Sequence, residues 1–177
     1  NRTVRQRPKL YKSHLLYAAP LMRSGNYRQA LRVLKQAGKL PDHSPWVDYN
    51  IAAGNLWLGQ TAEALIAAGR AAARGLVPKA WLLQGNCLER MGRPSLAGHY
   101  YRLASRNPET ASIALNNLGN IEVKLKRLER AAEMYRRASN ADPLFMEPRI
   151  SLGGVLVMLG RHAEAVDALE EVILQAE

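Results

Sequence analysis

Cysteine is almost absent from the sequence, since Cys87 is the only one among 177 residues. A single cysteine excludes an intrachain disulfide framework and any cysteine-rich zinc module. It leaves the compartment open, because proteins of the cytoplasm and of the bacterial periplasm can both lack disulfides. We expect no metal and no cofactor on these grounds.

Aromatic residues are also few, at 6% of the chain, and runs of Val, Ile and Thr are scarce. That scarcity argues against a β-sandwich. Ala and Leu are abundant and favour helices. With 47% hydrophobic and 23% charged residues, the chain can bury a core in one domain. The composition predicts an all-α domain.

Long apolar runs are missing, and none approaches the roughly 18 residues that a membrane-spanning helix needs. The first residues, Asn-Arg-Thr-Val-Arg, contain neither an initiator Met nor the apolar core of a signal peptide. We therefore expect no membrane span in this sequence, and we expect the chain to be a fragment of a longer protein.

Acidic residues are outnumbered, with 15 Asp and Glu against 25 Lys and Arg and a formal net charge of +10. The excess lies in residues 1–44, whereas residues 146–177 are acidic. A basic chain can meet an acidic protein, an anionic surface or nucleic acid. Binding of single-stranded nucleic acid also needs interleaved aromatics, and only Tyr11 and Tyr17 lie near the basic segment, which disfavours nucleic acid. The complementary ends allow a homo-oligomer.

A repeat organises the sequence, in which a Gly or Lys is followed five residues later by Ala. The pairs are Gly25/Ala30, Gly59/Ala64, Gly92/Ala97, Lys126/Ala131 and Gly160/Ala165. Successive pairs are 33 or 34 residues apart. A repeat of this length predicts a solenoid of helical pairs, because no single unit can bury its apolar face alone. The repeats are 11–44, 45–77, 78–111, 112–145 and 146–177, and residues 1–10 form a basic amino-terminal arm. Positions below are counted from the first residue of each repeat.

Small residues recur at position 8 and again at position 27, where two helices must approach closely. The Gly at position 15 suits a left-handed cap at a helix end. Pro20 falls inside the first helix of the first repeat, so we expect that helix to be kinked or to start late. Residues 32–45 are predicted to form a loop.

These columns resemble the tetratricopeptide repeat family. The residues that carry the resemblance are Leu118, Gly119, Leu128, Ala131, Tyr135, Ala138 and Pro143, and then Leu152, Gly153, Gly160, Ala165 and Leu169. The resemblance implies a right-handed superhelical solenoid of about five helix-turn-helix repeats. It also implies a scaffold, adaptor or chaperone-like function in complex assembly, in which the first helices line a concave groove for an extended or acidic peptide of another protein.

Ten residues at the positions of the first helices that face this groove are the candidate contacts. They are Trp46, Tyr49, Asn50, Lys79, Asn86, Arg90, Asn116, Asn117, Asn120 and Lys124. A side-chain amide carries both a donor and an acceptor and can pair with a peptide backbone. Lys and Arg can hold a carboxylate, and large aromatic rings can anchor an apolar residue.

Trp81 is predicted to pack in the core. Trp57 falls on a groove position, where its ring can also serve as an anchor, and core packing is the favoured interpretation for it. The four histidines fall in different repeats without a catalytic or metal-binding spacing, so we expect surface or interhelical roles for them and no catalytic residue. Cys87 is expected to be buried and inert. Two alternatives to groove binding stay open: an oligomeric scaffold that uses its end faces, and binding of nucleic acid or an anionic surface through the basic amino-terminal third.

Overall fold

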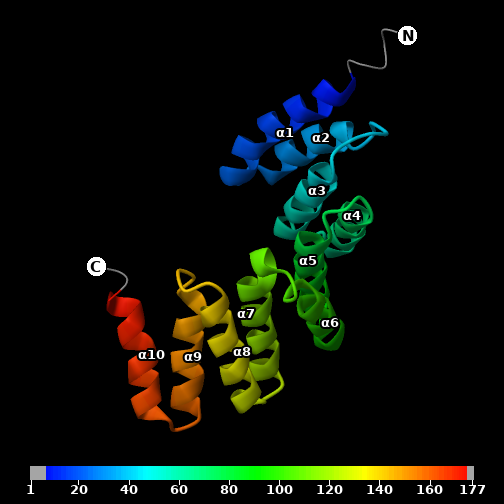
Figure 1. The fold of residues 1–177 in the computed structure, drawn as a ribbon. Coiled ribbons are helices and arrows are strands. Elements are labelled where there is room, and N and C mark those ends of the chain that lie inside the picture. Colours follow the sequence, from blue (N-terminus) through cyan, green and yellow to red (C-terminus); the bar gives the residue numbers. More distant parts are fainter. Residues whose placement is uncertain (1–6, 175–177) are drawn as a thin grey trace. The chain divides into compact units, whose positions relative to one another are not determined.

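A computed structural model describes residues 7–174, and all its regular elements are α-helices (Figure 1). The helices within this range are α1 (Arg7–Arg23), α2 (Tyr27–Ala37), α3 (Pro45–Trp57), α4 (Thr61–Ala73), α5 (Val77–Arg90), α6 (Pro94–Ala104), α7 (Pro108–Lys124), α8 (Leu128–Ala141), α9 (Glu147–Met158) and α10 (His162–Leu174). They form five helix-turn-helix pairs, which confirms the predicted all-α repeat fold.

Two compact units make up the chain, Asn1–Ala97 and Gly98–Glu177. In the first unit α1 packs on α2, α3 on α4 and α4 on α5. In the second unit α7 packs on α8, α8 on α9 and α9 on α10. Within each unit, these helices therefore pack on the next one along the chain, as a repeat architecture requires.

The turns inside the repeats use the left-handed backbone conformation that the Gly column predicts. Gly25, Gly59, Gly92 and Gly160 have φ between 71° and 77°. In the fourth repeat a lysine takes the same place, and Lys126 has φ 58°. A side chain with a Cβ is strained at such φ values, so glycine suits this column.

The small-residue columns are the points of closest helix approach. Ala37, Ala71, Ala104 and Ala138 at position 27 are all fully buried. At position 8 of the fourth repeat, a Cβ on Gly119 would lie 2.4 Å from Cε1 of Tyr135. Because Tyr135 fills the space that any larger residue would need, the glycine fixes how α7 packs on α8.

The predicted loop was wrong, and one of the two outcomes expected for the first helix was not found. Residues 32–37 belong to α2 rather than to a loop, because Leu34 and Ala37 lie one turn apart on a buried face of that helix. The first helix does not start late, since α1 begins at Arg7 and continues through Pro20. The predicted arm at residues 1–10 stays a prediction, and residues 1–6 lie outside the described residues.

No helix within residues 7–174 is both long enough and apolar enough to cross a membrane.

Candidate functional site

The first helices of neighbouring repeats touch each other within each unit. In the first unit α3 contacts both α1 and α5, and in the second unit α7 contacts α9. Side chains at the predicted groove positions of α3 and α5 therefore share one face of the first unit, the inner face. The corresponding positions of α7 and α9 form the inner face of the second unit.

An aromatic cluster with a lysine lies on the inner face of the first unit. Trp46 remains 40% exposed, and its ring meets Tyr49 edge-on with the centroids 5.3 Å apart. The ammonium of Lys79 on α5 lies 5.2 Å from the centroid of the Trp46 ring. This cation–π contact joins α3 to α5 and leaves part of the indole open to solvent.

The start of α3 holds Trp46 in place. Pro45 occupies the first turn, where its missing N–H costs nothing, and the Ser44 side chain accepts a hydrogen bond from the Trp46 amide at 3.3 Å. One turn later Asn50 donates from Nδ2 to the carbonyl of Trp46 at 2.8 Å. Its Oδ1 has no partner among the described residues and can accept a hydrogen bond.

Tyr49 is the half-buried member of the cluster. Burial raises the pKa of its hydroxyl, and the nearby charge of Lys79 opposes that rise. The phenol therefore stays neutral at physiological pH. In that state it can still donate one hydrogen bond.

Arg90 and Asn86 come from the same helix as Lys79 but differ in their surroundings. Arg90 donates from its guanidinium to the carbonyl of Leu56 at 2.7 Å, near the end of α3. This bond ties the second and third repeats together, and the Leu56 carbonyl also accepts a hydrogen bond from the Gly59 amide at 3.1 Å. Asn86 is half-buried.

On the inner face of the second unit, the predicted asparagines separate into buried and accessible ones. Asn116 is only 3% exposed, so its side chain cannot contact a bound peptide. Asn117 is half-buried and Lys124 is exposed. Asn120 accepts a 2.6 Å hydrogen bond from the Tyr135 hydroxyl through Oδ1. Its Nδ2 has no partner among the described residues and can donate.

The sequence profile of the tetratricopeptide repeat family matches residues 89–145 and 116–176. Solved structures extend the match over nearly the whole chain. MamA residues 41–end from Desulfovibrio magneticus RS-1 superposes with a TM-score of 0.75 at 20% identity, covering 94% of this chain and 95% of that one.

The chain is a tetratricopeptide repeat protein.

Pseudomonas aeruginosa PilF superposes on this tetratricopeptide repeat protein with a TM-score of 0.85 at 17% identity, covering 96% of this chain and 78% of that one. YrrB, described as having an unusual peptide-binding site, gives 0.64 at 18% identity, covering 92% and 84%. At these identities the likeness shows the fold. No curated protein sequence matches the chain. The tetratricopeptide repeat fold supports protein–protein interaction scaffolds in general and is typical of non-enzymatic modules.

The core prediction for Trp57 of the repeat protein was wrong. Trp57 is 64% exposed and stacks parallel to Tyr27 of α2 with the centroids 5.6 Å apart. It lies at the last residue of α3, where no neighbouring helix covers its outer face. Trp81 is partly buried and does not contradict its predicted core position. Cys87 is fully buried as expected, and burial raises the pKa of its thiol to about 11.

An apolar stripe on α9 was missed by the sequence analysis. Ile150, Val157 and Met158 are 53%, 50% and 61% exposed. Ile150 and Met158 occupy positions 5 and 13 of the fifth repeat, which hold groove candidates in other repeats, and Val157 lies at position 12. Reading those columns through to the last repeat would have found them. The inner face of the second unit thus combines amide groups on α7 with apolar side chains on α9.

A buried ionic network was also missed, because its members come from separate elements. Nε2 of His43 lies 2.8 Å from Oδ2 of Asp48, and both residues are buried. Arg70 of α4 and Arg74, the residue that follows this helix, approach the same carboxylate at 2.8 Å and 3.4 Å. The network fastens the α2–α3 loop to the second repeat. Nothing in the spacing of these residues predicts it.

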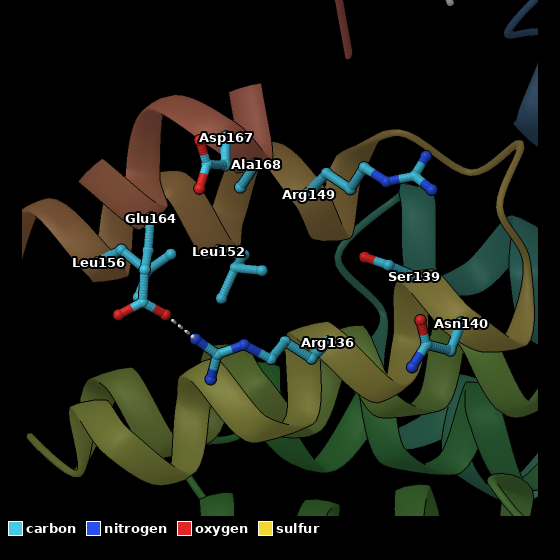
Figure 2. Close-up of a pocket in the computed structure, with 9 residues that line it drawn as sticks. All are labelled: Arg136, Ser139, Asn140, Arg149, Leu152, Leu156, Glu164, Asp167 and Ala168. Atoms are coloured by element: carbon cyan, nitrogen blue, oxygen red, sulfur yellow. Dashed lines mark hydrogen bonds and ion pairs between the residues drawn. The ribbon is translucent and has the colours of Figure 1, made fainter. Parts of the chain in front are cut away.

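Three pockets lie on the opposite side of the repeats from the inner face, each between two successive second helices with a first helix as the floor. They measure about 330 Å³ between α2 and α4, about 440 Å³ between α6 and α8, and about 300 Å³ between α8 and α10. All three are lined by positions 25, 28 and 29 of one repeat and by positions 4, 7, 11, 19 and 22 of the next. We call them the outer pockets. Figure 2 shows the α8–α10 example.

Metal ligands do not gather in the part of the chain that the structure describes: no three His, Cys, Asp or Glu side chains there could hold an ion together.

Proposed function

We propose that the protein binds an extended peptide segment of another protein on the inner faces of its repeats. The observation that best supports this proposal is the partly exposed Trp46 ring, with Lys79 over it and Tyr49 at its edge. Exposed aromatic rings held by their neighbours bury large apolar area on binding at a low entropic cost, and they dominate the energetics of many interfaces.

Polar groups beside the ring supply the means to hold a peptide backbone. Asn50 offers Oδ1 as an acceptor one turn from Trp46, and Asn120 offers Nδ2 as a donor in the second unit. Lys79 and Lys124 add positive charge to the same faces, which favours a segment with acidic residues. The proposed contact set also includes Asn86, Asn117 and Arg90. The Arg90 guanidinium already donates to the Leu56 carbonyl, so Arg90 contributes mainly its positive charge.

The test is a selection of extended peptides from a random phage-displayed library on the full chain, followed by calorimetric titration of the peptide selected. Trp46→Ala and Asn50→Ala should each weaken binding by about 1–2 kcal/mol, since each removes one anchoring contact. Ile66→Ala serves as the matched control, because Ile66 is an exposed apolar residue on the second helix α4. Equal affinity for wild type, Trp46→Ala and Asn50→Ala would contradict the proposal.

A further inference from the structure

The outer pockets differ from one another at two facing positions, 25 and 19. In the α8–α10 pocket these positions hold Arg136 and Glu164, whose side chains pair at 3.0 Å (Figure 2). Arg161 also bonds Glu164 from the neighbouring turn at 2.6 Å. The basic group at position 25 is thus neutralised within the fold.

In the α6–α8 pocket the acidic member of that pair is replaced by a second arginine. Position 25 is Arg102 and position 19 is Arg130. Among the residues that the structure describes, neither guanidinium has a hydrogen-bond or ion-pair partner, and the same holds for Arg106 at position 29. Arg137, which lines the same pocket, reaches Glu133 only at 3.8 Å. Four arginines thus line the pocket against two glutamates, Glu122 and Glu133, which leaves an excess of positive charge there.

The floor of this pocket has a different character from its rim. Leu115 and Leu118 of α7 are 5% and 4% exposed and form an apolar base beside Met134. Glu122 also lines the pocket, and its buried Oε2 forms an ion pair at 3.7 Å with Arg127, which lies outside the pocket lining.

We propose that the α6–α8 outer pocket binds an acidic peptide segment of a partner protein. Carboxylates of the segment pair with Arg102, Arg106 and Arg130, because the guanidinium fork matches a carboxylate in two parallel hydrogen bonds. An apolar side chain of the segment covers the leucine floor.

A peptide fits this lining better than nucleic acid does. Glu122 and Glu133 repel a continuous polyanion, whereas a peptide can alternate charge with neutral groups. No aromatic side chain lines the pocket in the described structure, so bases would find nothing to stack on. This site lies on the second helices and is separate from the inner faces on which the proposed function depends.

The experiment measures fluorescence anisotropy of a fluorescein-labelled peptide of five Glu-Leu repeats, titrated with the full chain. The double variant R102Q/R130Q should bind the probe about tenfold more weakly or worse, because two charge-assisted contacts are lost. The matched control R28Q/R32Q removes the same charge from exposed positions on α2 and should change affinity by less than about twofold. R130E restores the glutamate of the equivalent pocket, pairs Arg102 and should weaken binding as well.

Three results would overturn the proposal. The first is an equal loss in R102Q/R130Q and R28Q/R32Q, which would mean attraction by net charge alone. The second is an unchanged affinity in R102Q/R130Q together with a loss in a Trp46→Ala variant, which would place the probe on the inner face and leave the proposed function standing. The third is that a labelled decathymidylate binds as tightly as the peptide probe and loses affinity to the same extent in R102Q/R130Q.

Discussion

His43 and Asp48 form a buried contact at 2.8 Å that links the α2–α3 loop to α3. The other ring nitrogen of His43, Nδ1, lies 2.6 Å from the carbonyl oxygen of Leu40. The imidazole is thus held from both sides, by a backbone carbonyl and by a buried carboxylate. Asp48 is 1% exposed and also receives Arg70 and Arg74, which supplies the compensation that a buried carboxylate needs.

Asp48→Asn should lower the free energy of unfolding by about 2–3 kcal/mol. The variant leaves His43 buried without its anionic partner, whereas Arg70 and Arg74 are partly exposed and regain water. Urea denaturation followed by circular dichroism measures the loss. Asp42→Asn, in the same loop but exposed, should change stability by less than about 0.5 kcal/mol. A similar stability for the two variants would contradict the structural role of the network.

Gly119→Ala should destabilise the protein by about 1–3 kcal/mol, because the new Cβ would fall 2.4 Å from the Tyr135 ring. The ring cannot move away freely, since its hydroxyl donates to Asn120 and α8 is packed around it. Thermal or urea unfolding checks the loss.

Gly154→Ala is the matched control for this substitution. Gly154 lies in helix α9 with nothing within 4 Å of its added Cβ. There alanine should raise the unfolding free energy by about 0.5–1 kcal/mol through its higher helix propensity. Two variants with the same sign of effect would show that the helix-packing column is misassigned.

The period of the repeat is what made the fold predictable from sequence. Small residues at positions 8 and 27 and glycine at position 15 recur because each repeat solves the same packing problem, and Ala37, Ala71 and Gly25 show the predicted burial and backbone. Contacts that occur once cannot be found in this way. His43 meets Asp48 through a loop, and Arg90 reaches the Leu56 carbonyl 34 residues away.

The candidate site was predictable only in part for a related reason. The columns identify which side chains face inward, and Trp46, Tyr49 and Lys79 do form one cluster. The columns do not reveal how much of each side chain a neighbouring helix covers. Asn116 is therefore buried although it shares the groove columns, and Trp57 is exposed although the core was expected.

Cys87 should resist thiol reagents in the folded protein. Burial raises the pKa of the thiol to about 11, so the reactive thiolate is scarce at pH 8, and the side chain has no exposed surface. Ellman's reagent should react only at the rate of unfolding, and it should react fully in urea. Rapid reaction without denaturant would contradict the burial.

The same thiol should make stability depend on pH on the alkaline side. The folded state holds the proton more tightly than the unfolded state, whose thiol titrates near 9.0. The stabilisation is therefore fully present below pH 9 and is lost as pH rises through about 11. Relative to Cys87→Ala, the wild type should lose roughly 2–3 kcal/mol over that range. A constant difference between the two proteins across the range would refute the assignment.

Lys126→Gly should stabilise the protein by about 1 kcal/mol. Lys126 has φ 58°, a left-handed conformation that four other repeats assign to glycine, and the Cβ of a lysine is strained there. Glycine also gains freedom in the unfolded chain, which reduces the benefit.

The reverse change, Gly160→Lys, places a side chain at φ 73° in the fifth repeat and should cost about 1 kcal/mol. Both effects can be measured as shifts of the urea midpoint at constant slope. If Lys126→Gly lowers stability, its side chain must contribute contacts worth more than the backbone strain, and the turn of the fourth repeat would then be held by that lysine rather than by the repeat geometry.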